Sequence, residues 1–284
     1  MALPVMVKAA LPMVPGINQI PGIKKSGGDF ADITRERTGA VINAAQVAAY
    51  AEVCGFEPKD DAPLTYPHML AFPLHMEIMT SREFPYPAIG TVHLRNTIHQ
   101  LRPVHPGESL DIAVSATNLR AHPKGKVFDM VAGASIDGET VWESTSTYLR
   151  LGRSEAAAAV LDSEPFEVVA GNGITWRLPG NLGRRYGAVS GDMNPIHLFP
   201  LTAKALGFKR QIAHGMWTKA RCVAAIANRL GDEATVEVEF KKPIFLPGIV
   251  AFGSRVVDGA GGKGIDFSVT NPKSGAPHLV GRAR

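Results

Sequence analysis

The sequence has little of what marks several large classes of protein. It contains only two cysteines in 284 residues, Cys54 and Cys222, so a disulfide scaffold is excluded and both are expected to be buried free thiols. No apolar run reaches the ~20 residues that a membrane-spanning helix needs. The N-terminal stretch is apolar but interrupted by prolines, and it lacks the charged start of a signal peptide. We therefore expect a cytoplasmic protein without a membrane span.

Several motifs of binding and catalysis are also missing. The net charge is only +4, and no block of lysines and arginines is present, so nucleic acid is not an expected partner. The chain has no HExxH or CxxC metal spacing and no G-x-S-x-G nucleophile turn. The glycine-rich segment 259–264 lies between two expected strands with no helix behind it, which indicates a hairpin turn rather than a phosphate loop.

The composition supports a globular protein with one large or two modest domains, because 45% of the residues are hydrophobic and 20% are charged. Residues 1–38 are expected to form an irregular lead-in with one short strand. Residues 41–54 favour a helix closed by Gly55, three prolines break the segment 63–73, and a second helix is expected at 74–82. Alternating patterns then predict strands at 91–98, 109–116, 127–135 and 140–149.

The second half repeats this plan. It predicts one strand within 166–178, a bent segment, a short helix at 200–206 and a longer helix at 216–230, then strands at 235–240, 249–258, 264–270 and 278–282. Segments 99–107 and 240–248 correspond, since each follows one alternating strand and precedes another. A repeat of this length predicts two copies of one α+β domain, each with a helix packed on an antiparallel sheet.

Residues 186–219 carry the clearest chemistry. Asp192 stands five residues before His197, and Gly191 with Asn194-Pro195 predicts a bend between them. A carboxylate and an imidazole held together can orient one water molecule and accept its proton. The same sequence also suits a simple turn in which Asp192 only caps backbone N–H groups.

A second block follows at His214 and Gly215. Glycine at the start of a helix can bring a bare N–H to a ligand, and the positive end of the helix favours developing negative charge there. Gly215 could instead serve only tight packing. We expect His214, Ser190 and Asn194 to hold the loop in shape. A metal site built from Asp192, His197 and His214 is disfavoured, because their spacing matches no common metal motif.

The two blocks, Ser190 to His197 and Ile212 to Met216, resemble the motif of the MaoC-like, R-specific enoyl-thioester hydratases. The resemblance implies a double hotdog fold, in which each of two curled antiparallel sheets wraps a long helix. It implies reversible dehydration of (3R)-3-hydroxyacyl thioesters to trans-2-enoyl thioesters in fatty acid metabolism. Asp192 and His197 would hold the water, and the Gly215 N–H would bind the thioester oxygen. The resemblance implies neither a metal nor a cofactor. It implies a substrate carried by coenzyme A or by acyl carrier protein, and it is compatible with a homodimer.

The first copy lacks this motif, since residues 43–56 contain no Asp-x4-His and Pro67-His68-Met69 is a weak echo of His214-Gly215-Met216. We expect an N-terminal hotdog domain at 39–155 without the motif, a linker at 156–165 and a catalytic hotdog domain at 166–284. The first copy would give room for a long or bulky acyl chain. Two alternatives stay open: an acyl-thioester hydrolase of hotdog fold, and a non-catalytic acyl-binding subunit.

Overall fold

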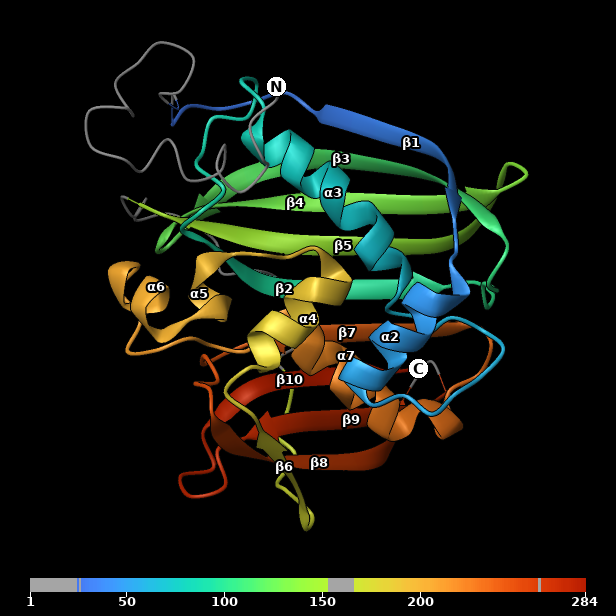
Figure 1. The fold of residues 1–284 in the computed structure, drawn as a ribbon, viewed down its shortest axis with the longest axis vertical. Coiled ribbons are helices and arrows are strands. Elements are labelled where there is room, and N and C mark those ends of the chain that lie inside the picture. The colour runs from blue at the N-terminus through green and yellow to red at the C-terminus, as the bar shows by residue number, and fades with distance from the viewer. Residues whose placement is uncertain (1–24, 26, 153–165, 260–261) are drawn as a thin grey trace.

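A single antiparallel sheet of ten strands runs through the protein (Figure 1). The computed structural model describes residues 25, 27–152, 166–259 and 262–284, so the expected linker at 156–165 and most of the lead-in lie outside the described residues. The strands follow the spatial order β1-β3-β4-β5-β2-β7-β10-β9-β8-β6. Their bounds are β1 Ile33–Val41, β2 Thr91–Gln100, β3 Ser109–His122, β4 Gly125–Ile136, β5 Glu139–Leu151, β6 Ile174–Leu178, β7 Ala234–Phe240, β8 Gly248–Gly259, β9 Gly262–Thr270 and β10 Pro277–Ala283.

Each half of this sheet curls around one long helix. Helix α3 (Pro67–Thr80) packs on β1, β3 and β4, whereas α7 (Gly215–Ile226) packs on β7 and β9. The halves join where β2 pairs with β7, with Asn96 opposite Val238. Two further helices, α2 (Ala44–Cys54) and α4 (Leu182–Ser190), contact each other across the join. The expected α+β double hotdog is confirmed.

The sequence pattern explains most of these elements. In β3, alternate side chains from Leu110 to Ala116 are buried, because successive residues of a strand point to opposite faces of the sheet. Helix α2 begins after Asn43, whose side chain accepts the Gln46 N–H, and ends at Gly55 in the left-handed conformation. Cys54 and Cys222 are buried free thiols, as predicted. No helix within the described ranges is long and apolar enough to cross a membrane.

The second predicted helix, at 74–82, was placed wrongly. Helix α3 begins seven residues earlier, at Pro67, and contains Pro73. Proline at the first helical position loses nothing, since its missing N–H would have no partner there. Pro73 removes one interior hydrogen bond, and burial of side chains on either side of it, such as Met69 and Met76, offsets that loss.

Two other segments differ from the prediction in extent. Strand β1 begins at Ile33, within the expected lead-in, and pairs with β3 across the expected boundary at residue 38. The strand expected within 166–178 is limited to Ile174–Leu178. The segment before the bend forms helix α4, from Leu182 to Ser190. The bend itself is confined to the residues that follow Ser190.

Candidate active site

The loop that carries Asp192 lies between two short helices. Helix α4 ends at Gly191, which adopts φ 74° as its left-handed cap, and α5 (Pro195–Leu198) begins after Asn194. The Asn194 side chain accepts the Ile196 N–H at 3.3 Å. The Ser190 hydroxyl accepts the Asp192 N–H at 3.2 Å, and the Asn194 N–H donates to Asp192 Oδ1 at 3.1 Å. These contacts fix the carboxylate at the end of α4.

His197 is held in one orientation by the backbone. Its Nδ1 lies 2.9 Å from the carbonyl oxygen of Ile212, and a carbonyl can only accept, so Nδ1 carries the hydrogen. The other nitrogen, Nε2, therefore has a free lone pair. Burial lowers the pKa of His197, although the nearby Asp192 carboxylate opposes that shift. The side chain is a neutral imidazole at pH ~7.

His214 has a different set of partners. Its Nε2 lies 3.0 Å from the backbone carbonyl of Asp192 and 3.8 Å from Asp192 Oδ2, so this nitrogen donates into the Asp192 loop. Its ring stacks on that of His197, with 3.7 Å between centroids, and packs against Tyr186. Burial lowers the pKa of His214 well below its ordinary value. The structure thus places His214 beneath the loop, bound to its backbone.

Close packing of α4 on α5 depends on one glycine. A Cβ atom at Gly183 would lie 1.9 Å from the carbonyl oxygen of His197, a distance that no side chain can occupy. The backbone that carries His197 can approach α4 only because residue 183 has no side chain. The sequence gives no separate signal for this role.

Helix α7 begins beside these groups. Gly215 is its first residue, and its N–H has no hydrogen-bond acceptor among the residues that the structure describes, as is usual in a first helical turn. A Cβ atom at Gly215 would lie 3.0 Å from the ring of Phe240. Thr218 secures the turn, since its N–H and its hydroxyl each donate to the His214 carbonyl at 3.1 Å. The positive end of α7 therefore faces the Asp192 loop.

Lys219, one turn further along α7, is not a surface cation. It is fully buried, and its Nζ donates to the Asn96 carbonyl, the Asn96 side-chain oxygen and the Val236 carbonyl at 3.1, 2.5 and 2.9 Å. Lys219 is therefore unavailable to an anionic carrier, because it anchors α7 to both strands of the join.

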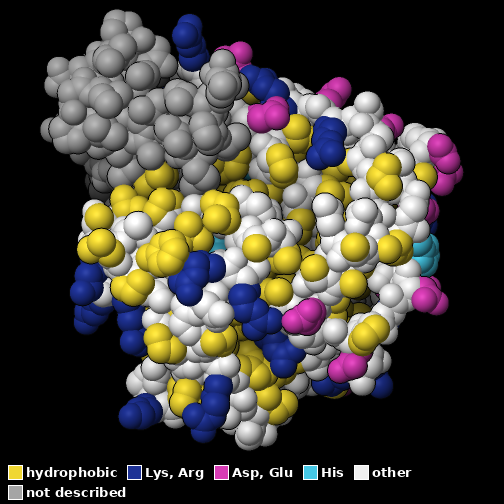
Figure 2. Space-filling model, in the orientation of Figure 1, with side chains coloured by type: hydrophobic (Ala, Val, Ile, Leu, Met, Phe, Trp, Pro, Cys, Tyr) yellow, Lys and Arg dark blue, Asp and Glu magenta, His cyan; other side chains and the backbone are white. Residues whose placement is uncertain are grey.

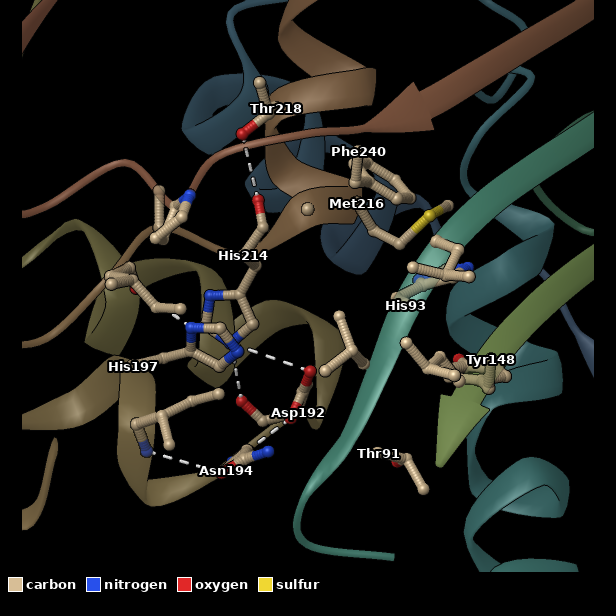
Figure 3. Close-up of a pocket in the computed structure, with 18 of the residues that line it drawn as sticks. Thr91, His93, Tyr148, Asp192, Asn194, His197, His214, Met216, Thr218 and Phe240 are labelled. Carbon is tan, nitrogen blue, oxygen red and sulfur yellow. Dashed lines mark hydrogen bonds and ion pairs between the residues drawn. The ribbon is translucent and has the colours of Figure 1, made fainter. Parts of the chain in front are cut away.

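Asp192, His197 and Gly215 line one cavity of about 490 Å³, which lies between the two halves of the protein (Figure 3). This volume is in the range of small-molecule sites. The second half contributes Asp192, His197 and the start of α7, while β2 and β5 carry His93 and Tyr148 on the opposite wall. The first half also supplies an apolar surface, formed by Met69, Phe72, Met76, Met79, Ala88, Ile89, Val92 and Leu149.

Asp192, His197 and His214 could together be considered as metal ligands, since their donor atoms lie within 4.8 Å of one another. The geometry does not fit. Two imidazoles that bind one ion must direct nitrogen lone pairs at a common point, whereas these rings stack with only 25° between their planes. The Nε2 atom of His214 is also occupied by the Asp192 carbonyl. The free donors that face the cavity are those of Asp192 and His197.

Comparison with known proteins identifies the family to which the chain belongs. A family model described as MaoC like domain matches residues 180–274. The 3-hydroxyacyl-thioester dehydratase X of Mycobacterium tuberculosis is 35% identical over 291 positions, which cover 97% of this chain and 94% of the relative. The chain belongs to the MaoC-like 3-hydroxyacyl-thioester dehydratases, a family of hydro-lyases.

Solved structures match over nearly the whole fold. A crystal structure of HtdX from Mycobacterium tuberculosis, 36% identical, has a TM-score of 0.76 and covers 89% of this chain and 99% of its own. A MaoC-like dehydratase from Phytophthora capsici, 19% identical, has a TM-score of 0.73 with coverage of 90% and 94%. The latter supports the fold alone.

The sequence pointed to the loop but not to the walls around it. Tyr186, His93 and Tyr148 carry no motif, and only the curling of β2 and β5 brings two of them opposite Asp192. The sequence pointed to these walls in one way: the first copy lacks the motif, so we expected it to give room for the substrate.

Proposed function

We propose that this protein catalyses the reversible dehydration of (3R)-3-hydroxyacyl thioesters to trans-2-enoyl thioesters, as part of fatty acid metabolism. The observation that carries the proposal is the convergence of three groups on one cavity. They are the Asp192 carboxylate, the free Nε2 side of a neutral His197 and the unpaired N–H end of α7. Together they supply a proton acceptor, an orienting anion and a site for negative charge.

In the hydration direction, Asp192 and His197 hold one water molecule between them. Its oxygen forms a bond to C3, and its proton passes to the pair, where the lone pair of His197 Nε2 can accept it. Electrons of the double bond move toward the thioester oxygen, which the Gly215 N–H stabilises at the positive end of α7. A proton from the pair then reaches C2. Dehydration follows the same steps in reverse.

Hydration of crotonyl-CoA, followed by loss of enoyl absorbance, tests the proposal. The purified protein should be active, and Asp192→Asn should lower kcat at least ~100-fold, because a neutral amide lacks the negative charge that orients the water molecule beside His197. An Asp192→Asn protein with full hydration activity would falsify the mechanism. Release of free thiol from a saturated acyl-CoA would instead indicate a thioester hydrolase. Absence of both reactions would indicate a non-catalytic acyl-binding subunit.

The walls of the cavity suggest how a substrate lies. Met69, Phe72, Met76 and Met79 lie on one face of α3 and offer an apolar surface to an acyl chain. Lys241 and Lys242 line the same cavity from the loop after β7, and both are exposed. Such cations suit an anionic carrier, either coenzyme A or acyl carrier protein. Rates measured with one acyl group on each carrier would distinguish the two.

We also propose that the protein functions as two fused hotdog units with one active site per chain. The N-terminal unit begins with β1, and the C-terminal unit, from residue 166 onward, holds every residue assigned a catalytic or supporting role here. The supporting roles belong to Ser190, Asn194 and His214, whose hydrogen bonds hold the Asp192 loop.

A further inference from the structure

Hydrophobic side chains are exposed at the start of helix α6 (Pro200–Ala205). Leu201 is 79% exposed, Phe199 is 48% exposed, and Pro200 between them also faces solvent. Figure 2 shows hydrophobic side chains gathered over α5 and α6, with side chains of lysine or arginine beside them. Adjoining apolar side chains in contact with water are unfavourable, so such a patch commonly marks an interaction surface.

The charges that this part of the chain adds to the surface are all positive. No aspartate or glutamate occurs between Asp192 and Asp232 in the sequence. The exposed basic residues on α6 and in the loop after it are Lys204, Lys209 and Arg210. None of the three forms an ion pair or a side-chain hydrogen bond with a residue that the structure describes. Their charges are therefore available to an anionic partner.

Basic and apolar side chains lie next to one another here. The guanidinium of Arg184 lies over the ring of Phe199, 4.8 Å from its centroid. Lys204 stands three residues after Leu201 on α6, so both project from the same side of that helix. We define the α6 surface as Arg184, Phe199, Pro200, Leu201, Lys204, Lys209 and Arg210.

The α6 surface adjoins the cavity. Ile196 on α5 and Phe208 after α6 both line the cavity, so the chain leaves its wall and returns to it on either side of α6. The exposed charged residues that line the cavity, Lys124, Lys241 and Lys242, are also cations. A carrier bound at the α6 surface would therefore lie beside a positively charged entrance.

The chemistry of this surface favours a protein as its partner. The phosphates of coenzyme A suit the lysines that line the cavity, but a small ligand in the cavity cannot cover the outer side of α6. An acidic protein surface with apolar side chains would complement both the charges and the patch. A second copy of this chain, related by a two-fold axis, would place the positive surface against itself, which is unfavourable.

We propose that the α6 surface docks the acidic face of an acyl carrier protein, and that thioesters on this protein are preferred over those of coenzyme A. Apolar side chains of the carrier would contact Phe199 and Leu201, and its carboxylates would pair with Lys204, Lys209 and Arg210. This inference rests on the proposed function, since it assumes that the carrier delivers its acyl group to the same cavity.

Hydration rates of one crotonyl group on two carriers test the preference. The carriers are coenzyme A and the acyl carrier protein of the same cells. In the natural protein, kcat/KM should be about tenfold higher with the carrier protein. Leu201→Asp, and Lys209→Glu combined with Arg210→Glu, should each lower that ratio about tenfold, because they place negative charge against an acidic partner. The rate with crotonyl-CoA reports whether each variant is folded.

A matched control and a binding measurement complete the test. Arg37 is exposed on the edge strand β1, and Arg37→Glu reverses a charge there without touching the α6 surface, so the ratio should stay as in the natural protein. Calorimetric binding of the carrier protein without an acyl group does not depend on catalysis. Its affinity should fall about tenfold in the Leu201→Asp protein and should also weaken as salt is added.

The outcomes separate the two proposals. The docking surface is overturned if the carrier protein does not bind, or if the ratio survives in both variants of the α6 surface. It is also overturned if Leu201 is needed instead for binding vesicles of anionic phospholipid, or for self-association in analytical ultracentrifugation. If crotonyl-CoA is hydrated and the carrier protein is not bound, only the docking fails. If the carrier protein binds through these residues but neither thioester is hydrated, only the proposed reaction fails.

Discussion

His197 and His214 are the same kind of side chain, and their hydrogen-bond partners give them different chemistry. The Ile212 carbonyl takes the Nδ1 hydrogen of His197 and leaves Nε2 free. The Asp192 carbonyl takes the Nε2 hydrogen of His214, whose remaining nitrogen is buried without a partner. Only His197 therefore has a lone pair for substrate, while His214 supports the loop from below.

Because burial lowers the pKa of His197 below its ordinary value of 6.5, activity should persist at mildly acidic pH. The working form is the neutral imidazole, and it is lost only as pH falls through the lowered pKa. A profile of kcat/KM against pH for crotonyl-CoA should therefore have its acidic limb below pH ~6.5. A half-maximal point above that value would contradict the assignment of His197 as the proton acceptor.

At the scale of single elements, the proposed reaction requires precise placement of α7, because its first N–H would bind the substrate oxygen. Lys219 ties α7 to β2 and β7 through three acceptor oxygens. Asn96 and Val236, which carry those oxygens, are fully buried. The Lys219 side chain therefore links the position of α7 to the β2–β7 pair that joins the two halves.

Replacing Lys219 with Met should lower the free energy of unfolding by about 3 kcal/mol, because three buried acceptor oxygens lose their donor. Denaturant titration measures this change, and kcat for crotonyl-CoA should also fall if the start of α7 moves. Lys204→Met, at an exposed position on α6 (Pro200–Ala205), should change stability by less than ~0.5 kcal/mol. Equal effects of the two substitutions would argue against an anchoring role.

Helix α3 is the element that shapes the acyl end of the cavity. Met76 is 8% exposed and lines it, so Met76→Trp should fill space that a long chain needs. The ratio of kcat/KM for sixteen-carbon over four-carbon enoyl-CoA should drop about tenfold, whereas Met76→Leu should keep it. A strict preference of the natural protein for the four-carbon substrate would contradict the idea that the first copy admits long chains.

Sequence reasoning succeeded where the pattern is local and failed where distant segments meet. Alternation placed the strands, and the Asp-x4-His block placed the loop, because both depend on neighbouring residues. The start of α3 was missed because Pro67 and Pro73 suggest a break, and burial of the helix overrides that signal. Burial of Lys219 and the stacking of His93 on Tyr148 depend on how β2 meets distant parts of the chain, which no short pattern records.

At the scale of the whole molecule, four buried histidines and the partly buried His93 make stability depend on pH. Burial lowers the pKa values of all of them: His68, His75, His93, His197 and His214. In the unfolded chain these histidines bind protons at about pH 6.5, whereas in the folded chain they bind them only at lower pH. Stability is therefore complete above pH ~6.5 and decreases as pH falls from there toward the lowered pKa values.

His75 allows this effect to be measured, since its pKa is lowered from 6.5 to about 4 and its nitrogens have no partner among the described residues. The natural protein loses stability as the pH falls from ~7 to ~4, and His75→Leu should make that loss about 3 kcal/mol smaller. At pH ~7 the substitution should be close to neutral, because it deletes an unsatisfied polar group. Thermal unfolding at several pH values would show it, and an unchanged acid slope would contradict the prediction.

The start of α3 has a consequence for kinetics. Where α7 begins with Gly215, which offers an N–H, α3 begins with Pro67, which has none. The N-terminal hotdog unit therefore cannot bind a thioester oxygen through the first N–H of its long helix. With one active site per chain, as proposed, a single chain offers no pair of equivalent sites through which one substrate could alter the affinity for another. Its rate should rise hyperbolically with substrate concentration, and any cooperativity would have to come from contact between chains.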